Sequence, residues 1–480
     1  MPMQYLTADE VRDAERASGD LLANGTLMRR ASHGVARVVA AELNRTGGCY
    51  GRRVGIVVGA GDNGGDALFA GAELARRGVA VHAVLLAPDK AHPAGLAAFR
   101  AAGGRVVPTT GGGAALPAGL DIVVDGVVGI GGKGPLRPAA AAVFAALAPE
   151  TTVVAVDLPS GVDCDTGEVH DPSVRADITV TFGHPRRVHL LAAPRCGRLA
   201  VVDIGIGKPS ERVAPRLFSF SDEDIDWPVP GPADDKYTQG VVGVIAGSHR
   251  YPGAAILASG AAVTATSGMT RYVGSAHAEV VSHFPEVVAV PDLAEAGRVQ
   301  AWTVGPGMGT DDAAEATLRT VLDTDLPVLV DADALTIVAR RPELVADRTA
   351  PTLLTPHAGE FARLTGTALG ADRLSAVAGL AAEWNVTVLL KGRITLVADP
   401  TGSVAGNDAG SSWAATAGAG DVLAGIAGSL LAAGHTPQTA GAWAARVHAR
   451  AALLASRGAP IGASTLLAAL RPAIREFVRG

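Results

Sequence analysis

Cysteine, aromatic side chains and positive charge are all scarce in this chain. Three of its 480 residues are cysteines, aromatic residues make up 4%, and the formal net charge at pH 7 is −6. Cys49, Cys164 and Cys196 are scattered and form no CxxC pair, so the sequence predicts neither a disulfide framework nor a zinc site. The charge balance leaves no basic field for nucleic acid or for an acidic membrane surface.

The sequence also lacks the pattern of a secretory leader and of a membrane span. The opening stretch MPMQYLTADEVRDAER carries acids early and has no apolar core. Residues 253–270 and 422–434 lack charged side chains, but their apolar residues are interrupted by glycine, alanine and serine, which predicts buried helices. We therefore expect a cytoplasmic protein with no nucleic-acid partner and no membrane partner.

Glycine and small apolar residues are abundant instead, with 60 glycines and 48% apolar residues. Apolar runs at residues 53–58, 79–86, 121–124 and 151–156 predict buried strands. A capping box at residues 7–10 opens one predicted helix, and another is expected at about 27–43. Strands that alternate with helices predict an α/β protein whose parallel sheets are covered on both faces.

A change in composition at residues 207–240 predicts a domain boundary. This segment contains KPSER and SDEDIDWPVPGPADDK, where prolines and acids lie close together, and the alternation of strands and helices resumes after it. At roughly 100–200 residues per domain, the chain is long enough for two or three domains. We expect a first domain at residues 1–215, a linker at 216–235 and a second domain at 236–480.

Three loops in the first half carry acids where predicted strands end. GAGDNGGDAL follows the run at 53–58 and opens a helix, so its backbone N–H groups form a ready anion site. Asp125 and Asp157 end two further strands, and Ser160 lies in the turn after the second. A carboxylate at the carboxyl end of a strand is well placed to act as a general acid or base. Taken singly, the glycine loop is also compatible with a tight structural turn, and Asp157 with a cap.

These loops resemble the NAD(P)H-hydrate epimerase family over residues 1–210. The matching pieces are LMRRAS, GAGDNGGD, VDGVVGIGGKG, DLPSGVD and ADITVTFGHPRR. The resemblance implies a Rossmann-like three-layer αβα domain in which Asp157 is catalytic, with Lys133 as a second candidate. It implies a potassium site at Asn63, Asp125 and Ser160. The implied substrate contacts are Asp62, Asn63, Gly64, Gly65, Asp66, Gly129, Ile130, Gly131, Gly132, Lys133, Gly134, Pro135 and Asp157.

The most informative stretch of the second half is TAGAGDVLAG. Glycines precede Asp421 at the start of a predicted helix, so the N–H groups of residues 419–421 form an anion hole for a phosphoryl group. Asp421 is then placed to accept the proton of an attacking hydroxyl. A P-loop is not predicted, because GxxxxGK[ST] does not occur. The alternative for Asp421 alone is an ordinary N-cap.

Six motifs in order resemble the ADP-dependent NAD(P)H-hydrate dehydratase of the ribokinase-like superfamily over residues 236–480. They are GSHRYPGAAILA, GPGMGT, VDADAL, TPHAGEFARL, KGRITLV and AATAGAGDVLAG. The resemblance implies a ribokinase-like αβα domain that uses ADP and Mg²⁺. The implied hydrate-site residues are Ala255, Gly307, His357 and Asp421. The implied nucleotide-binding residues are Lys391, Gly392, Arg393, Ile394, Thr395 and Gly420. Taken alone, His357 is equally well explained as a cap or core histidine, and Lys391 as a strand-end lysine that reaches solvent.

Together the two resemblances imply a bifunctional repair enzyme for hydrated nicotinamide cofactors. The first half would interconvert the R and S hydrates of NAD(P)H at C6, and the second would dehydrate the S form while ADP becomes AMP and phosphate. The expected ligands are the hydrates, ADP, Mg²⁺ and K⁺, and a homo-oligomer is expected. The alternative is a ribokinase-like kinase of a small molecule whose N-terminal half is a non-catalytic nucleotide-binding module.

Overall fold

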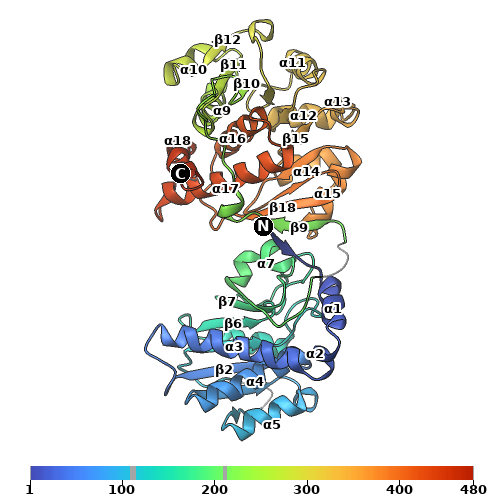
Figure 1. The fold of residues 1–480 in the computed structure, drawn as a ribbon, viewed down its shortest axis with the longest axis vertical. Helices are drawn as coiled ribbons and strands as arrows, with labels where there is room; N and C mark the ends of the chain where they lie inside the picture. Colours follow the sequence, from blue (N-terminus) through green and yellow to red (C-terminus); the bar gives the residue numbers. More distant parts are fainter. Residues whose placement is uncertain (1, 109–114, 209–212, 479–480) are drawn as a thin grey trace. The chain divides into compact units, whose positions relative to one another are not determined.

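The computed structural model describes residues 2–108, 115–208 and 213–478 and separates into two compact units. One unit comprises Gln4–Val213, and the other comprises Met1–Met3 together with Ala214–Gly480. Each unit has helices around its own sheet (Figure 1), so the predicted α/β class is confirmed.

The sheet of the Gln4–Val213 unit is parallel throughout. Its seven strands lie in the order β4 (Arg105–Val106), β3 (Ala80–Leu85), β2 (Arg53–Val58), β5 (Ile122–Gly126), β6 (Thr152–Val156), β7 (Ile178–Phe182) and β8 (Arg198–Val202). The chain runs outward from β2 to β4 and then returns to the other side of β2. The strand order therefore reverses between β2 and β5, which is where open α/β sheets bind ligands.

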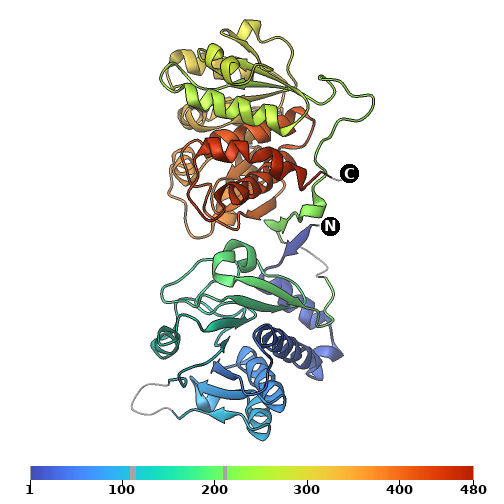
Figure 2. The ribbon, with the colours of Figure 1, turned by 90° about the vertical axis from the view of Figure 1, so that its left-hand side faces the viewer.

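Helices cover both faces of this sheet, as predicted. The helices α3 (Thr26–Asn44), α4 (Asp62–Arg76) and α5 (Pro93–Ala101) form one core with the sheet, and α6 (Pro138–Ala145) packs on the opposite face (Figure 2). The strand β2 explains the division, since Ile56 belongs to the first core and Val57 to the second. The remaining helices are α1 (Ala8–Ala17), α2 (Asp20–Ala23), α7 (Val188–Leu191) and α8 (Ala193–Cys196).

The predicted capping box is confirmed at the start of α1. The Thr7 hydroxyl accepts a hydrogen bond from the Glu10 amide at 3.1 Å, and the Glu10 carboxylate accepts one from the Thr7 amide at 2.8 Å. Two of the amides that a helix start leaves unpaired are thereby satisfied.

The second sheet has eleven strands. Their order is β1 (Met3–Tyr5), β9 (Arg216–Ser219), β18 (Ser403–Asp408), β17 (Ile394–Ala398), β16 (Thr387–Leu390), β15 (Thr352–Leu354), β14 (Val328–Val330), β13 (Ala301–Val304), β10 (Val241–Ile245), β11 (Met269–Val273) and β12 (Val288–Val290). The strands from β10 to β16 pair in parallel, whereas β17 is antiparallel to both β16 and β18. The predicted parallel sheet is thus confirmed for β10 to β16, and the antiparallel pairs of β17 were not predicted. The short connection between β16 and β17 permits only an antiparallel pair.

The two uncharged stretches are buried helices, as predicted. They form α9 (Pro252–Ala265) and α16 (Ala419–Ala432), which pack with α17 (Pro437–Ser456) in one core. A Cβ at Gly425 of α16 would collide with the Ala258 carbonyl of α9, so glycine permits this close approach. No helix among the described residues is both long enough and apolar enough to cross a membrane.

Further helices complete the second unit. They are α10 (His277–His283), α11 (Asp312–Leu322), α12 (Ala332–Arg340), α13 (Glu343–Ala346), α14 (Ala358–Thr365), α15 (Arg373–Glu383), α18 (Ala463–Ala468) and α19 (Leu470–Arg475).

The segment expected to be a linker contributes to the second unit. Its strand β9 pairs with β18, and Trp227 is 4% exposed, with its indole N–H donating to the Ala265 carbonyl at 2.9 Å. Residues 209–212, within the segment that predicted the boundary, lie outside the described residues. The exact domain limits remain a prediction.

Candidate active sites

Three loops of the first unit meet at the carboxyl ends of β2, β5 and β6, which are neighbours in the sheet. Asn63, in the first turn of α4, joins them. Its side-chain amide donates to the Val128 carbonyl at 2.9 Å and to the Val156 carbonyl at 2.8 Å. Glycine permits the close approach, because a Cβ at Gly59 would collide with the Val127 carbonyl.

Asp125 and Ser160 form a buried pair at the base of these loops, and neither side chain is exposed. The Ser160 hydroxyl donates to Asp125 Oδ1 at 2.7 Å, and the Ser160 amide donates to Oδ2 at 2.8 Å. Burial raises the pKa of Asp125 to about 6, even though these hydrogen bonds act in the opposite direction. No ion pair of the described residues involves the Asp125 carboxylate. Its ionised form therefore lacks a positive partner, which a bound cation would supply.

The start of α4 combines open backbone donors with a buried acid. No side chain caps this helix, whose first residue, Asp62, is exposed. Asp66 points inward instead, and the Ser32 hydroxyl donates to it at 3.0 Å. Burial raises the pKa of Asp66 well above its usual value, and the nearby charges of Asp157 and Asp62 act in the same direction. Open N–H groups suit a substrate phosphate, whereas the Asp66 side chain contacts α3.

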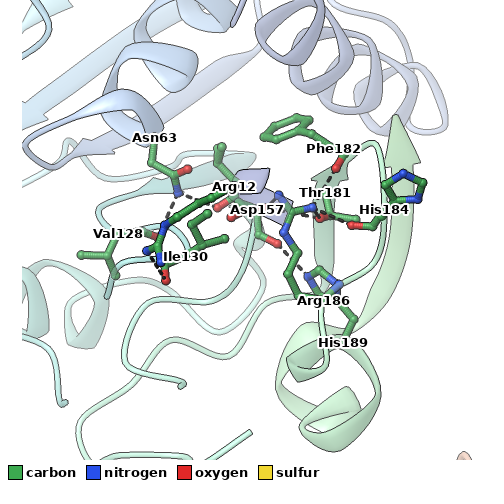
Figure 3. A network of polar contacts seen from close by, with 11 residues as sticks. Arg12, Asn63, Val128, Ile130, Asp157, Thr181, Phe182, His184, Arg186 and His189 are labelled. Carbon is green, nitrogen blue, oxygen red and sulfur yellow. Dashed lines mark hydrogen bonds and ion pairs between the residues drawn. The ribbon is translucent and has the colours of Figure 1, made fainter. Parts of the chain in front are cut away.

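Asp157 follows β6 in a left-handed backbone conformation, with φ of 68°. This conformation costs a residue other than glycine about 1–3 kcal/mol and is common at functional sites. The Asp157 carboxylate is 3.1 Å from the guanidinium of Arg186, and both side chains are buried (Figure 3). Sequence reasoning did not single out Arg186, because its neighbours His184, Pro185 and Arg187 give no pattern that predicts burial.

The 129–135 loop is mostly accessible. Arg12 of α1 donates to the Ile130 carbonyl at 3.4 Å (Figure 3). Lys133 is exposed, and its positive charge acts on the pKa of Asp163. Burial raises the pKa of Asp163, but hydrogen bonds from the following turn and the charge of Lys133 lower it overall. No contact among the described residues joins Lys133 to Asp157.

In the second unit five of the six motifs lie at the ends of β10, β13, β14, β15 and β16, which are consecutive in the sheet, and the sixth, AATAGAGDVLAG, follows β18. Lys391, at the end of β16, lies 2.7 Å from Asp331 and 3.5 Å from Glu360. Burial acts to lower the pKa of Lys391, but these two carboxylates raise it overall. The lysine is therefore a charged partner of two acids, and the interpretation as a strand-end lysine reaching solvent is wrong.

His357 is the N-cap of α14, which confirms one of its two simpler interpretations. Its Nδ1 accepts hydrogen bonds from the amides of Gly359 at 3.0 Å and Glu360 at 3.2 Å. Nδ1 is therefore unprotonated in this geometry, and Nε2 carries the hydrogen. His357 also lines a cavity, so the cap role does not exclude ligand contact.

A cavity of about 450 Å³ opens beside the start of α16. The predicted residues Lys391, Gly392, Arg393, Thr395 and Gly420 all line it, together with His357. Its wall also contains five further residues of the motif AATAGAGDVLAG, namely Ala414, Ala415, Thr416, Ala419 and Leu423. The residues that the sequence did not indicate are Asn407, Ala409, Ser411, Ser412, Ala445, His448, Ala449 and Ala452.

His448 fixes the backbone at the start of α16. Its Nε2 lies 2.9 Å from the Ala419 carbonyl, and burial lowers the pKa of His448 to about 4. The neutral ring therefore donates from Nε2 to that carbonyl. No side chain caps α16. The Ala419 amide donates to the Thr416 carbonyl at 3.2 Å, which leaves the amides of Gly420 and Asp421 for an anion. An isolated histidine in the alanine-rich helix α17 was the only sequence signal for this role.

Asp421 lies in the first turn of α16, next to Gly420 of the cavity wall. Burial raises the pKa of Asp421 to about 7, the charge of Asp331 adds to the rise, and Lys391 opposes it. A carboxyl group with this pKa is suited to accept a proton near neutral pH.

The other predicted residues lie elsewhere. Ile394 is buried within β17, and Ala255 is fully buried in α9. Gly307 lies close to Gly247 and Tyr251 and is not among the residues that line the cavity. Only part of the predicted set is thus brought to this cavity.

Comparison with known proteins gives matches in both halves. Residues 242–472 match the family described as NAD(P)H-hydrate dehydratase, and residues 24–188 match the family described as YjeF-related protein N-terminus. The chain is 58% identical over 432 residues to the bifunctional NAD(P)H-hydrate repair enzyme Nnr of Mycobacterium tuberculosis, covering 90% of this chain and 89% of that protein. It is 54% identical over 477 residues to the protein of the same name from Mycobacterium leprae, covering 98% and 99%.

A solved structure is also similar to about half of the chain. It is the ADP/ATP-dependent NAD(P)H-hydrate dehydratase from Bacillus subtilis co-crystallized with ATP/Mg²⁺, at 27% identity and a TM-score of 0.47. The match covers 54% of this chain and 98% of that chain. Since both halves match and these relatives span nearly the whole sequence, the chain belongs to the family of bifunctional NAD(P)H-hydrate repair enzymes.

Proposed function

We propose that this chain repairs hydrated nicotinamide cofactors by two reactions. The Gln4–Val213 unit interconverts the R and S hydrates of NAD(P)H, and the second unit dehydrates the S hydrate with ADP. The observation that carries the proposal is Asp421, whose pKa is raised to about 7, at the open start of a helix beside a cavity lined by Gly420 and Lys391. This arrangement supplies a base, an anion hole and a cation within one site.

For the epimerase, the proposed base is Asp157. The hydroxyl at C6 of the hydrate is on a carbon bonded to the ring nitrogen. Loss of the hydroxyl as hydroxide, or opening of the ring, gives a planar carbon that can be re-formed with either configuration. A carboxylate beside this carbon moves the hydroxyl proton and stabilises the developing positive charge. The open amides at the start of α4 are placed to hold the substrate phosphate, with residues 129–135 around the nicotinamide.

Potassium is proposed at the base of the epimerase loops. The Asp125 carboxylate is fully buried and unneutralised within the described residues, and the Asn63 and Ser160 side chains bring further oxygen atoms beside the same loops. Such hard oxygen donors suit an alkali cation. A bound K⁺ would neutralise the buried charge and hold the three loops together.

For the dehydratase, the proposed base is Asp421. It accepts the proton of the C6 hydroxyl as the hydroxyl oxygen attacks the terminal phosphoryl of ADP, which releases AMP. The C6 oxygen is now part of a phosphate ester, and this phosphate leaves far more readily than hydroxide. Loss of a proton from C5 restores the C5–C6 double bond and gives NAD(P)H. The amides at the start of α16 stabilise the migrating phosphoryl group.

Adenine nucleotide is proposed to occupy the cavity of about 450 Å³, with Lys391 and Arg393 near its phosphates. Mg²⁺ would neutralise those phosphates. The described residues contain no group of three histidine, cysteine or acidic side chains arranged for a metal ion. The nucleotide phosphates themselves are therefore expected to supply most of the ligands of Mg²⁺.

The experiment that tests the proposal uses an Asp421→Asn variant. We expect it to bind ADP with little change but to lose dehydration by 100-fold or more, since general base catalysis typically contributes about 10²–10⁴-fold. Unchanged turnover would refute the role of Asp421. If the wild-type chain instead accumulated a phosphorylated small molecule, the kinase alternative would be favoured. The absence of epimerase activity alone would favour a non-catalytic N-terminal module.

A further inference from the structure

The Asp157 carboxylate is held by a buried network that the proposed epimerase steps do not use (Figure 3). Arg186 is 1% exposed, and its Nη2 lies 3.1 Å from Asp157 Oδ1. Thr181 of β7 bridges the pair, because its hydroxyl donates to the same Oδ1 at 3.2 Å and accepts from Arg186 Nη1 at 2.8 Å. Both contacts end on Oδ1. Within the described residues Oδ2 makes no hydrogen bond or ion pair, although the side chain is buried, so Oδ2 is the oxygen left to meet a substrate.

The guanidinium is itself fixed from the opposite side. Arg186 Nη1 also donates to the backbone carbonyls of Phe182 at 2.7 Å and His184 at 2.6 Å. These carbonyl oxygens accept from Nη1 but carry no charge, and the buried Nε has no partner among the described residues. A charged partner therefore contributes strongly to stabilising this buried cation. Asp157 is that partner. The planar, forked guanidinium can join the carbonyls, the Thr181 hydroxyl and the carboxylate at once, which a lysine cannot do.

His189 fixes the backbone of Asp157 in the same network. Its Nε2 lies 2.7 Å from the Asp157 carbonyl, and its Nδ1 accepts from the Arg186 amide at 2.8 Å. The histidine therefore donates from Nε2 and ties the left-handed residue 157 to the chain at 186. Arg186, Thr181 and His189 together determine both the backbone and the side-chain orientation of Asp157.

We propose that Arg186 is the positioning residue of the epimerase site, holding Oδ1 of Asp157 so that Oδ2 faces the C6 hydroxyl of the hydrate. Thr181 completes the hold on the side chain, and His189 holds the backbone. This inference rests on the proposed epimerase function and adds residues that bind no substrate themselves. A misplaced carboxylate transfers protons more slowly but does not weaken substrate binding. Loss of the positioning residue should therefore lower kcat and leave KM nearly unchanged.

The test measures R-to-S conversion by the full chain without ADP, using Arg186→Met, Arg186→Lys and Thr181→Val. We expect Arg186→Met to lower kcat by about 100-fold while KM changes less than about threefold, because small misplacements of this kind cost about 10² in rate. Arg186→Lys keeps the positive charge but lacks the planar guanidinium with its several donors, so we expect kcat to fall by about tenfold. Thr181→Val keeps the shape and removes only the bridge, and we also expect a loss of about tenfold in kcat.

Arg348→Met is the matched control. Arg348 is likewise a buried arginine held by backbone carbonyls, including that of Leu322 at 2.7 Å, but it lies in the second unit. Its loss should leave epimerase kcat unchanged. A folded Arg186→Met variant with kcat within about threefold of wild type overturns the inference. So does a raised KM at unchanged kcat, or an equal kcat loss in the control.

The experiment also decides if the Arg186→Met variant is unfolded or if the wild-type chain is inactive. If Arg186→Met does not fold, Thr181→Val decides, and an unchanged kcat in that variant overturns the inference. A folded wild-type chain with no R-to-S conversion contradicts the proposed epimerase function itself, and the variants are needed only once wild-type conversion is seen.

Discussion

At the scale of single residues, the account depends on two carboxylates whose surroundings differ. Asp157 contacts a fixed guanidinium and a hydroxyl, whereas burial and the charge of Asp331 raise the pKa of Asp421 to about 7. The first group has a buried charge partner, and the second is placed to change protonation near neutral pH. The two environments belong to the two proposed reactions, with Asp157 as the base of the epimerase and Asp421 as the base of the dehydratase.

The pH dependence of dehydration should follow Asp421. Because the base must be unprotonated, kcat/KM is expected to rise about tenfold per pH unit below pH 7 and to level off above it. Lys391 favours the ionised form of Asp421, so Lys391→Met should move the midpoint to higher pH, whatever it does to the maximal rate. Steady-state kinetics between pH 5.5 and pH 9 checks this, with the exposed Lys90→Met as control. A midpoint that stays in place or moves down would contradict this role of the lysine.

The sequence could identify these acids but not their partners. Asp125, Asp157 and Asp421 each lie beside glycines at the end of a predicted element, which is a local pattern. Arg186 and His448 act on residues about thirty positions away in the chain, and their contacts exist only after folding. Ala255 shows the opposite case, since a motif residue expected at the hydrate site is fully buried in α9.

At the scale of elements, the strands at the sheet centres were the easiest to predict. The run at residues 53–58 coincides with β2, and the predicted helix at 27–43 lies within α3. Continuous apolar runs between glycine loops leave few other interpretations. The antiparallel β17 and β18 were not foreseen, because their apolar pattern does not encode direction. The strand β9 was not predicted either, because it lies in a segment whose prolines and acids are typical of a linker.

Close packing of α9 and α16 gives a prediction about stability. Gly425→Ala puts a methyl group against the Ala258 carbonyl, and overpacking of this kind typically costs about 1–3 kcal/mol. We expect a lower melting temperature and a matching loss of dehydratase activity, since α16 carries Asp421. Gly379→Ala in α15 is the matched control, because nothing lies within 4 Å of its Cβ position. It should be neutral or stabilising, as alanine favours helices. Equal effects of the two substitutions, measured by thermal unfolding, would refute this packing argument.

The three epimerase loops predict a response to potassium. Replacing a bulky cation such as tetramethylammonium with K⁺ at equal ionic strength should raise the melting temperature of the first unit, because binding to the folded state stabilises it. Asp125→Asn removes the buried charge and should abolish the rise in melting temperature that K⁺ causes. Ser18→Ala is the control, because among the described residues the Ser18 hydroxyl donates only to the Glu15 carbonyl, and this variant should keep the rise in melting temperature. An increment that survives in Asp125→Asn would place the potassium elsewhere.

At the scale of the whole molecule, the two units hold two separate sets of site residues. Asp157 lies in the Gln4–Val213 unit and Asp421 in the other. Each proposed reaction should therefore be lost independently of the other, while repair of a mixture of hydrates needs both. A kinase with an inert first half would show no such division.

The most direct measurement follows the recovery of NAD(P)H absorbance from a mixture of R and S hydrates with ADP, Mg²⁺ and K⁺. Slow spontaneous epimerisation is measured without protein and subtracted. We predict that the wild-type chain recovers both epimers, that Asp157→Ala recovers rapidly only the S share, and that Asp421→Asn recovers neither. Mixing the two variants should restore complete recovery. If Asp157→Ala consumed the R hydrate as fast as wild type, or Asp421→Asn still formed NAD(P)H at the wild-type rate, the two-site account would be contradicted.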